Sequence, residues 1–103
     1  MSPGRYILDE NWKPIPEAAL DKWVAWFEKA ERQVAVETIG ESRISTLFLG
    51  LDHNYSGTGA PILWETMVFG GPLDQEQDRC SGSKEQAQAM HAAMVKRVKE
   101  TTP

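Results

Sequence analysis

The chain has 103 residues, of which 41% are hydrophobic and 25% are charged, and its net charge at neutral pH is −4. This length fits one domain, which we place at residues 1–103, and the composition is that of a globular protein and not of a disordered chain. Binding to nucleic acid requires clustered Lys and Arg, so the acidic balance argues against direct contact with DNA or RNA.

Cysteine content and hydropathy indicate the compartment. Cys80 is the single cysteine, so an internal disulfide is excluded and a reducing environment fits best. No stretch approaches the roughly 20 apolar residues that cross a bilayer. The first five residues also lack the apolar run of a signal peptide. We therefore expect a cytoplasmic protein without a membrane segment.

The N-terminal part predicts a short strand followed by a helix. Residues 6–8 have the composition of a strand, and residues 9–11 that of a turn. We expect the helix at residues 16–32, because Pro16 suits a first helical turn and apolar residues then recur at helical spacing. These apolar residues are Leu20, Trp23, Val24, Phe27 and Ala30.

The remaining chain predicts three strands and a second helix. The strands are expected at residues 34–39, 42–51 and 61–69, with a two-residue turn at Gly40–Glu41. Residues 78–82 have the composition of a polar loop. Ser83 suits the N-cap of the second helix, with Gln86 reaching back to it. The order β-α-β-β-β-α predicts an α+β fold with an antiparallel sheet of three to four strands and two helices on one face.

Alternation along the strands predicts that both faces of this sheet are apolar. With a turn at Gly40–Glu41, one face carries Val34, Val36, Leu47, Leu49, Leu51, Leu63, Met67 and Phe69, together with Arg43 and Glu65. The other carries Ile39, Ile44, Thr46, Phe48, Ile62, Trp64 and Val68. Two helices cover one face, so the other face needs a cover, and we expect a homo-oligomer to provide it.

Three side chains are candidates for catalysis: Asp52, His53 and Glu65. Asp52 and His53 lie where a strand opens into a glycine-containing loop, and both are acid–base groups. The alternative is that Asp52 and Asn54 cap a turn. Glu65 interrupts an apolar strand, which favours an acid, base or ligand-binding group. A structural pair with Arg43, a contact with His53 or a water-exposed edge position would also explain it.

Other residues are candidates for binding a ligand or partner. Asn54, Tyr55, Gly57 and Gly59 lie in a loop whose backbone N–H groups are able to face an anion, although a mobile hairpin loop explains the same composition. Trp26 and Trp64 are candidate contact residues, with burial in the core as the alternative.

Metal binding has little support in the sequence. His53 and His91 are the histidines available as ligands, but the chain has no His-x-x-x-His motif and no cysteine pair. A helical histidine on an apolar stripe, such as His91, is typical of a core residue with a hydrogen bond. We therefore predict no metal and no cofactor.

Three segments together resemble a family of small uncharacterised proteins encoded by bacteriophages and prophages. They are residues 23–28 (WVAWFE), 45–54 (STLFLGLDHN) and 65–71 (ETMVFGG), and the similarity spans nearly the whole chain. The resemblance implies a location in a bacterial host cell. It implies no reaction.

We expect a non-enzymatic phage accessory protein that binds a host target, with inhibition or sequestration of a host defence component as its effect. The target would be a host protein or a small nucleotide signal held by the loop that contains Asn54 and Tyr55. The alternative is a small metal-dependent or acid–base hydrolase that uses Asp52, His53 and Glu65.

Overall fold

The computed structural model describes residues 4–101, and it confirms an α+β fold with antiparallel sheets. The first three residues, on which part of the signal-peptide argument rests, lie outside this range. The elements in chain order are β1 (Tyr6–Leu8), β2 (Pro14–Pro16), α1 (Leu20–Lys29), β3 (Gln33–Ile39), β4 (Ser42–Phe48), β5 (Trp64–Phe69), β6 (Gln77–Cys80) and α2 (Lys84–Thr101). Within the described range, neither helix combines the length and the apolar character that crossing a bilayer requires.

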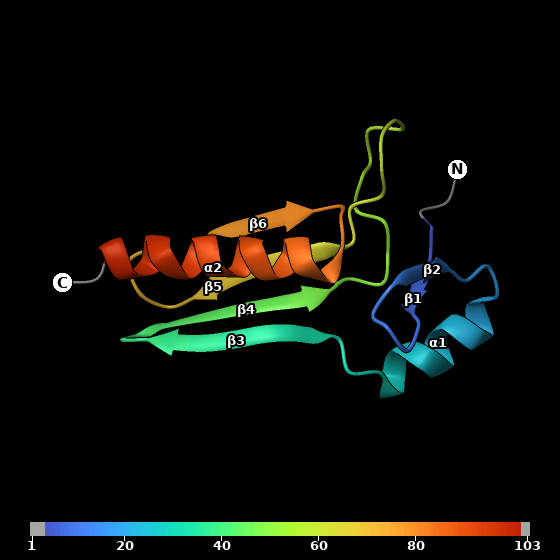
Figure 1. The fold of residues 1–103 in the computed structure, drawn as a ribbon, viewed down its shortest axis with the longest axis horizontal. Helices are drawn as coiled ribbons and strands as arrows, with labels where there is room; N and C mark the ends of the chain where they lie inside the picture. The colour runs from blue at the N-terminus through green and yellow to red at the C-terminus, as the bar shows by residue number, and fades with distance from the viewer. Residues whose placement is uncertain (1–3, 102–103) are drawn as a thin grey trace.

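The main sheet has four antiparallel strands in the order β3-β4-β5-β6, so each strand pairs with its neighbour in sequence (Figure 1). The expected turn at Gly40–Glu41 joins β3 to β4. A second turn follows β5, where Gly70 has φ +83° and a Cβ would lie 2.4 Å from the Glu41 carbonyl oxygen. Only glycine fits there without strain, so Gly70 allows the two turns to pack closely against each other.

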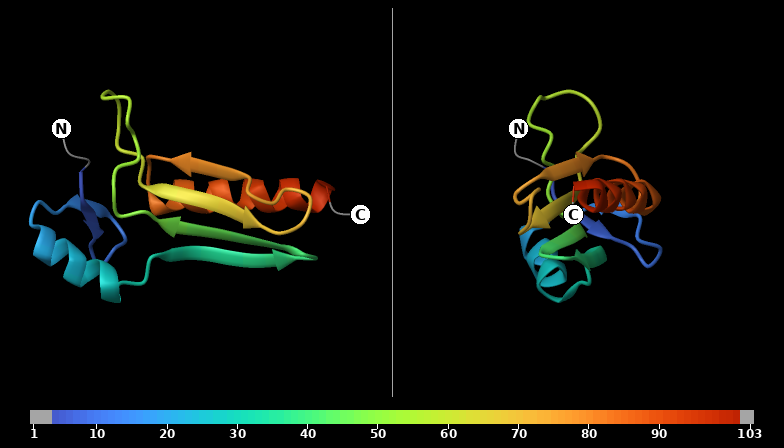
Figure 2. Two further views of the ribbon diagram at one scale, coloured as in Figure 1. Left: turned by 180° about the vertical axis from the view of Figure 1, so that it is seen from behind. Right: turned by 90° about the vertical axis from the view of Figure 1, so that its left-hand side faces the viewer.

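One face of this sheet forms the core beneath α2. Alternate residues of β4 and β5 point toward the helix and are fully buried, among them Ile44, Phe48, Trp64 and Val68. The helix supplies Ala87, Met90, His91, Met94, Val95 and Val98 to the same layer. Figure 2 shows α2 on this face and no described helix on the opposite face. The period-2 pattern of the strands thus meets the helical stripe in one apolar layer.

A β-bulge at the start of β3 changes the predicted parity. Gln33 pairs with Leu47, whereas Ala35 pairs with Thr46, so β3 contains one extra residue. Val34 lies at this irregularity and packs against the buried cluster of Phe48 and Trp64, not on the face where simple alternation placed it. A bulge cannot be read from alternation, because alternation assumes unbroken pairing.

The prediction placed both helices on one face of the main sheet, but α1 does not lie there. Instead, α1 packs against β1 in a separate N-terminal unit at the end of the sheet (Figure 1). The indole N–H of Trp23 donates to the carbonyl oxygens of Tyr6 and Gly50, at 3.1 and 3.0 Å. Leu20 is 58% exposed, so part of the apolar stripe that suggested burial on the sheet faces solvent.

Two strands were not predicted, and both ends of α1 differ from the prediction. Residues 14–16 pair with β1 as β2, so α1 begins at Leu20, and it ends at Lys29. Residues 77–80 form β6 against β5, although their polar composition predicted a loop. This edge strand exposes most of its side chains, so it carries no apolar alternation. The N-cap of α2 is confirmed, since the Gln86 N–H donates to Ser83 Oγ at 3.3 Å.

We predict that Phe48→Ala lowers the free energy of unfolding by about 3–5 kcal/mol, because a large fully buried ring is replaced by a cavity. Urea denaturation followed by tryptophan fluorescence measures the change. Tyr55→Ala is the matched control, since this ring is 76% exposed and its loss should cost no more than about 0.5 kcal/mol. Equal effects of the two substitutions would contradict the assigned core.

Candidate functional site

The loop between β4 and β5 is closed at its base by Asp52. Its Oδ1 accepts hydrogen bonds from the backbone N–H groups of Asn54 at 2.8 Å and Ile62 at 2.9 Å. The His53 N–H donates to the Ile62 carbonyl oxygen at 2.9 Å and continues the strand ladder. Asp52 therefore holds the two sides of the loop together, which is the turn-capping alternative for this residue.

Asn54 is the centre of the same loop. Its Nδ2 donates to the carbonyl oxygens of Thr58 at 2.7 Å and Ala60 at 2.9 Å. Its Oδ1 accepts from the backbone N–H and the hydroxyl of Ser56, at 3.1 and 2.5 Å. Both amide N–H donors are thus engaged within the loop, so this side chain has no donor left for a ligand.

The loop carries two neighbouring rings, of which Tyr55 is exposed and His53 is half-buried. The rings of His53 and Tyr55 lie 5.9 Å apart between centroids with a tilt of 45°. Gly57 and Gly59 have φ of +85° and +87°, which lets the chain reverse beyond Tyr55. Figure 1 shows the loop projecting away from the sheet. An exposed aromatic ring on a braced loop is suited to contact with a partner and lacks the enclosed surroundings of a catalytic centre.

Glu65 belongs to a different part of the molecule. It lies on the sheet face opposite α2, and its Oε2 accepts from Arg79 Nε at 2.8 Å. This partner is neither Arg43 nor His53, because β6, which was not predicted, places Arg79 directly across from Glu65. No group of three His, Cys, Asp or Glu side chains suited to a metal exists among residues 4–101.

His91 lies within the core layer and is 4% exposed. Its Nε2 is 3.2 Å from Glu37 Oε1, and its Nδ1 is 2.7 Å from Thr46 Oγ1, which in turn is 2.5 Å from Thr66 Oγ1. The Glu37 carboxylate accepts from the Nε2–H group, and in the tautomer that carries a proton on Nε2 alone, Nδ1 is an acceptor. Thr46 then donates to His91 and accepts from Thr66. The chain of hydrogen bonds fixes α2 against β3, β4 and β5.

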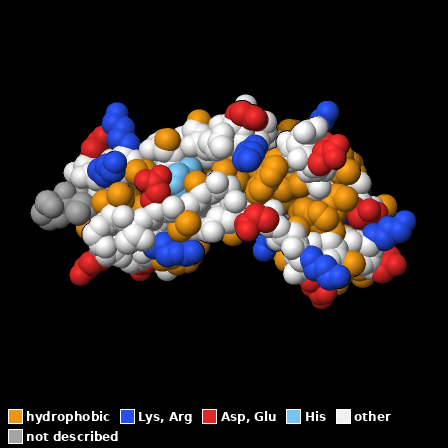
Figure 3. All heavy atoms as spheres, turned by 60° about the horizontal axis from the view of Figure 1, so that its bottom comes forward, with side chains coloured by type: hydrophobic (Ala, Val, Ile, Leu, Met, Phe, Trp, Pro, Cys, Tyr) orange, Lys and Arg blue, Asp and Glu red, His pale blue; other side chains and the backbone are white. Residues whose placement is uncertain are grey.

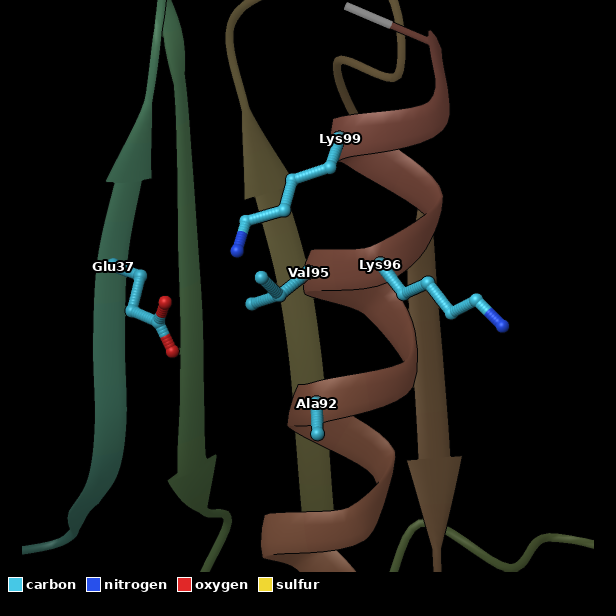
Figure 4. Close-up of a pocket in the computed structure, with 5 residues that line it drawn as sticks. All are labelled: Glu37, Ala92, Val95, Lys96 and Lys99. Atoms are coloured by element: carbon cyan, nitrogen blue, oxygen red, sulfur yellow. The ribbon is translucent and has the colours of Figure 1, made fainter.

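A groove of about 390 Å³ opens beside this histidine, between β3 and α2. It is lined by Glu37 of β3 and by Ala92, Val95, Lys96 and Lys99 of α2. In Figure 4 the side chains of Glu37, Val95 and Lys99 approach one another across the groove, whereas Lys96 turns to the other side of the helix. The sequence analysis missed this site, because it depends on how far α2 stands from the edge strand.

The sheet face opposite α2, here called the open face, is a further candidate contact surface. It carries the apolar side chains of Val36 (44% exposed), Leu47, Met67 and Phe69 (41% exposed). Arg43 lies over the Phe69 ring at 5.8 Å, and the Glu65–Arg79 pair lies at the other end of β5. The predicted parity placed these residues on one face, and the pairing of β3, β4 and β5 confirms it for them.

The two tryptophans proposed as contact residues are structural. Trp64 is fully buried, and its indole N–H donates to the Gly82 carbonyl oxygen at 2.7 Å. Trp26 is half-buried and packs edge-on against Phe48 at 5.9 Å. Figure 3 shows hydrophobic side chains gathered at the junction between α1 and the sheet. These rings therefore join the N-terminal unit to the core and leave the open face to other residues.

Cys80 ends β6 and packs against the same cluster. Burial, with a smaller effect of the Asp78 charge, raises the pKa of its thiol, while a backbone hydrogen bond from Gly82 opposes the shift. The thiolate, which is the nucleophilic form, is thus disfavoured at neutral pH.

Comparison with known proteins adds no relative. No model of a protein family, no curated protein and no solved structure matches this chain.

Asn54→Ala should loosen the projecting loop while leaving the fold intact, because four hydrogen bonds within the loop are lost. Amide hydrogen exchange should become faster across residues 54–60 and stay unchanged in β4 and β5. The exposed neighbour Thr58→Ala is the control, since its backbone and not its side chain accepts the bond from Asn54. Unchanged exchange in the loop would contradict the bracing role of Asn54.

Thr46→Val should lower the free energy of unfolding by about 1–3 kcal/mol, because it leaves buried groups of His91 and Thr66 without a partner. Thr66→Val should lower the free energy of unfolding by less, because it removes only the hydroxyl at the end of this chain of hydrogen bonds and leaves Thr46 bonded to His91. Chemical denaturation of both variants measures the order. A larger cost for Thr66→Val would contradict the central place of Thr46 in this chain of hydrogen bonds.

Proposed function

We propose that the protein is a non-enzymatic accessory protein that binds a host protein through the open face of its sheet. The single observation that carries this proposal is the uncovered apolar centre of that face, with Val36 and Phe69 exposed. A sheet face of this kind is suited to a macromolecular partner, because it is broad and has charged groups around an apolar centre.

The arrangement of charges supports binding and not chemistry. Glu65 is paired with Arg79 at the edge of the open face, where ion pairs set orientation more than affinity. Asp52 and Asn54 are occupied within their loop. The hydrolase alternative would need His53 to act with Asp52 and Glu65, and both of these carboxylates already have other partners. Sequestration of a nucleotide would need Asn54 to give up its bonds in the loop.

The resemblance to phage-encoded proteins supports the type of target, a component of a host defence system in a bacterial cell. We further propose that a second copy of the chain covers the open face when the target is absent. Target binding and self-association would then compete for one surface, which makes them testable with the same variants.

Phe69→Glu should abolish both interactions, because it places a carboxylate among the exposed apolar side chains of the open face. We expect the wild-type protein to form a dimer at about 50 μM and the variant to be a monomer, as measured by light scattering during size-exclusion chromatography. Captured from a bacterial lysate, the wild type should retain a host protein at one-to-one stoichiometry, and the variant should lose it.

Gln88→Glu is the matched control, since it adds the same charge at an exposed position of α2, on the other side of the molecule. It should keep the dimer and the captured protein. A wild-type monomer would overturn the self-association. A host protein retained equally by all three chains would overturn the assignment of binding to the open face.

A further inference from the structure

No strand within residues 4–101 pairs with the outer edge of β3, which is seven residues long. The outer backbone N–H and C=O groups of such an edge are free to pair with another extended chain. The bulge disturbs only the start of the strand, so residues 35–39 pair regularly with β4 and keep a regular outer edge. The opposite edge, β6, has only four residues.

The groove described above lies directly beside this edge. An extended chain added to β3 would direct alternate side chains to the α2 side of the sheet, as Glu37 does. Those side chains would enter the groove of about 390 Å³, where Ala92 and Val95 supply an apolar wall. The β3 edge therefore requires a ligand with an extended backbone, and the groove requires alternate side chains of moderate size.

The charged side chains of the groove determine which extended chains it favours. Lys99 forms no ion pair with any described residue, and Lys96 reaches Glu100 only at 3.9 Å between exposed side chains. The single carboxylate, Glu37, is already bonded to His91 at 3.2 Å. In Figure 4 the Lys99 side chain extends over the groove toward β3. An acidic side chain entering near Lys99 would therefore be favoured.

We propose that β3 and α2 form a binding site for an extended peptide segment, added antiparallel to β3, with an acidic side chain directed toward Lys99. Backbone pairing to β3 supplies the main attachment, and the groove selects the side chains. The site uses the α2 side of the sheet and its edge, so it is separate from the open face.

The test uses a fluorescein-labelled octapeptide with threonine at positions 1, 3, 5 and 7, glutamate at 2, valine at 4 and 6, and glycine at 8. Antiparallel addition places the glutamate near Lys99, which lies toward the end of both β3 and α2. We expect saturable binding with a Kd on the order of 100 μM in fluorescence anisotropy. A peptide with lysine in place of glutamate should bind about tenfold more weakly.

Two N-methylated peptides test the backbone pairing. In an antiparallel pair, alternate residues direct their N–H groups toward the neighbouring strand. Methylation of the backbone amides at either the odd or the even positions should therefore abolish binding, whereas methylation of the other set should not. If both sets or neither set abolish binding, edge addition is overturned.

Protein variants test the groove. Lys99→Glu should weaken the glutamate peptide about tenfold and improve the lysine peptide, whereas Lys22→Glu, the same change on α1, should alter neither. Circular dichroism confirms that the variants are folded. No binding at 1 mM peptide, or equal affinities for wild type and Lys99→Glu, would overturn the proposal, as would a homodimer that Lys99→Glu dissociates. Phe69→Glu, which adds a carboxylate to the open face on β5 and not on β3, should keep peptide binding, so failure of this site is distinguishable from failure of the open face.

Discussion

The packing of Phe48 between two tryptophans is the contact on which the arrangement of the whole chain depends. Its ring meets Trp64 within the sheet at 5.0 Å and Trp26 of α1 at 5.9 Å. Its backbone N–H donates to the Arg32 carbonyl oxygen, and its carbonyl oxygen accepts from the Arg32 guanidinium. Together with the hydrogen bonds of Tyr6 and Trp23 to the Gly50 carbonyl oxygen, these interactions attach the N-terminal unit to the end of the sheet.

The core beneath α2 combines apolar packing with one chain of buried hydroxyl and imidazole groups. Apolar side chains alone would allow the helix to slide along the sheet, because dispersion and burial have little directionality. The bonds from His91 to Thr46 and Glu37 have a defined geometry and are satisfied in one register only. They also hold α2 at a set distance from β3, and that distance is what leaves the groove open.

The strands β3, β4 and β5 and the helix α2 were predictable because their signals are local. The alternation in β4 and β5, the turn at Gly40–Glu41 and the cap at Ser83 each follow from neighbouring residues. The position of α1 was not predictable, because its apolar stripe meets β1 through Trp23 and leaves Leu20 in solvent. β6 was missed because an edge strand with exposed polar side chains has the composition of a loop.

The candidate sites divide in the same way. The open face was predictable, since parity alone collects Val36, Leu47, Met67 and Phe69. The partners of Asp52, Asn54 and Glu65 were not, because each depends on a residue that the fold brings near, such as Ile62 or Arg79. Residue type identified side chains that are able to do chemistry. In the folded chain, however, Asp52, Asn54 and Glu65 form hydrogen bonds or ion pairs that stabilise the structure.

A sheet covered by a helix on one face only offers two different surfaces for recognition. The open face is broad, and its apolar side chains are held on paired strands, so it suits a partner that presents a preformed surface. The β3 edge offers unpaired backbone and a narrow groove, which suit a segment that becomes ordered on binding. The sheet itself lies between the groove and the open face, so the two proposed sites face opposite sides of the molecule. If both proposals hold, the domain would bind a folded partner on one side and an extended segment on the other.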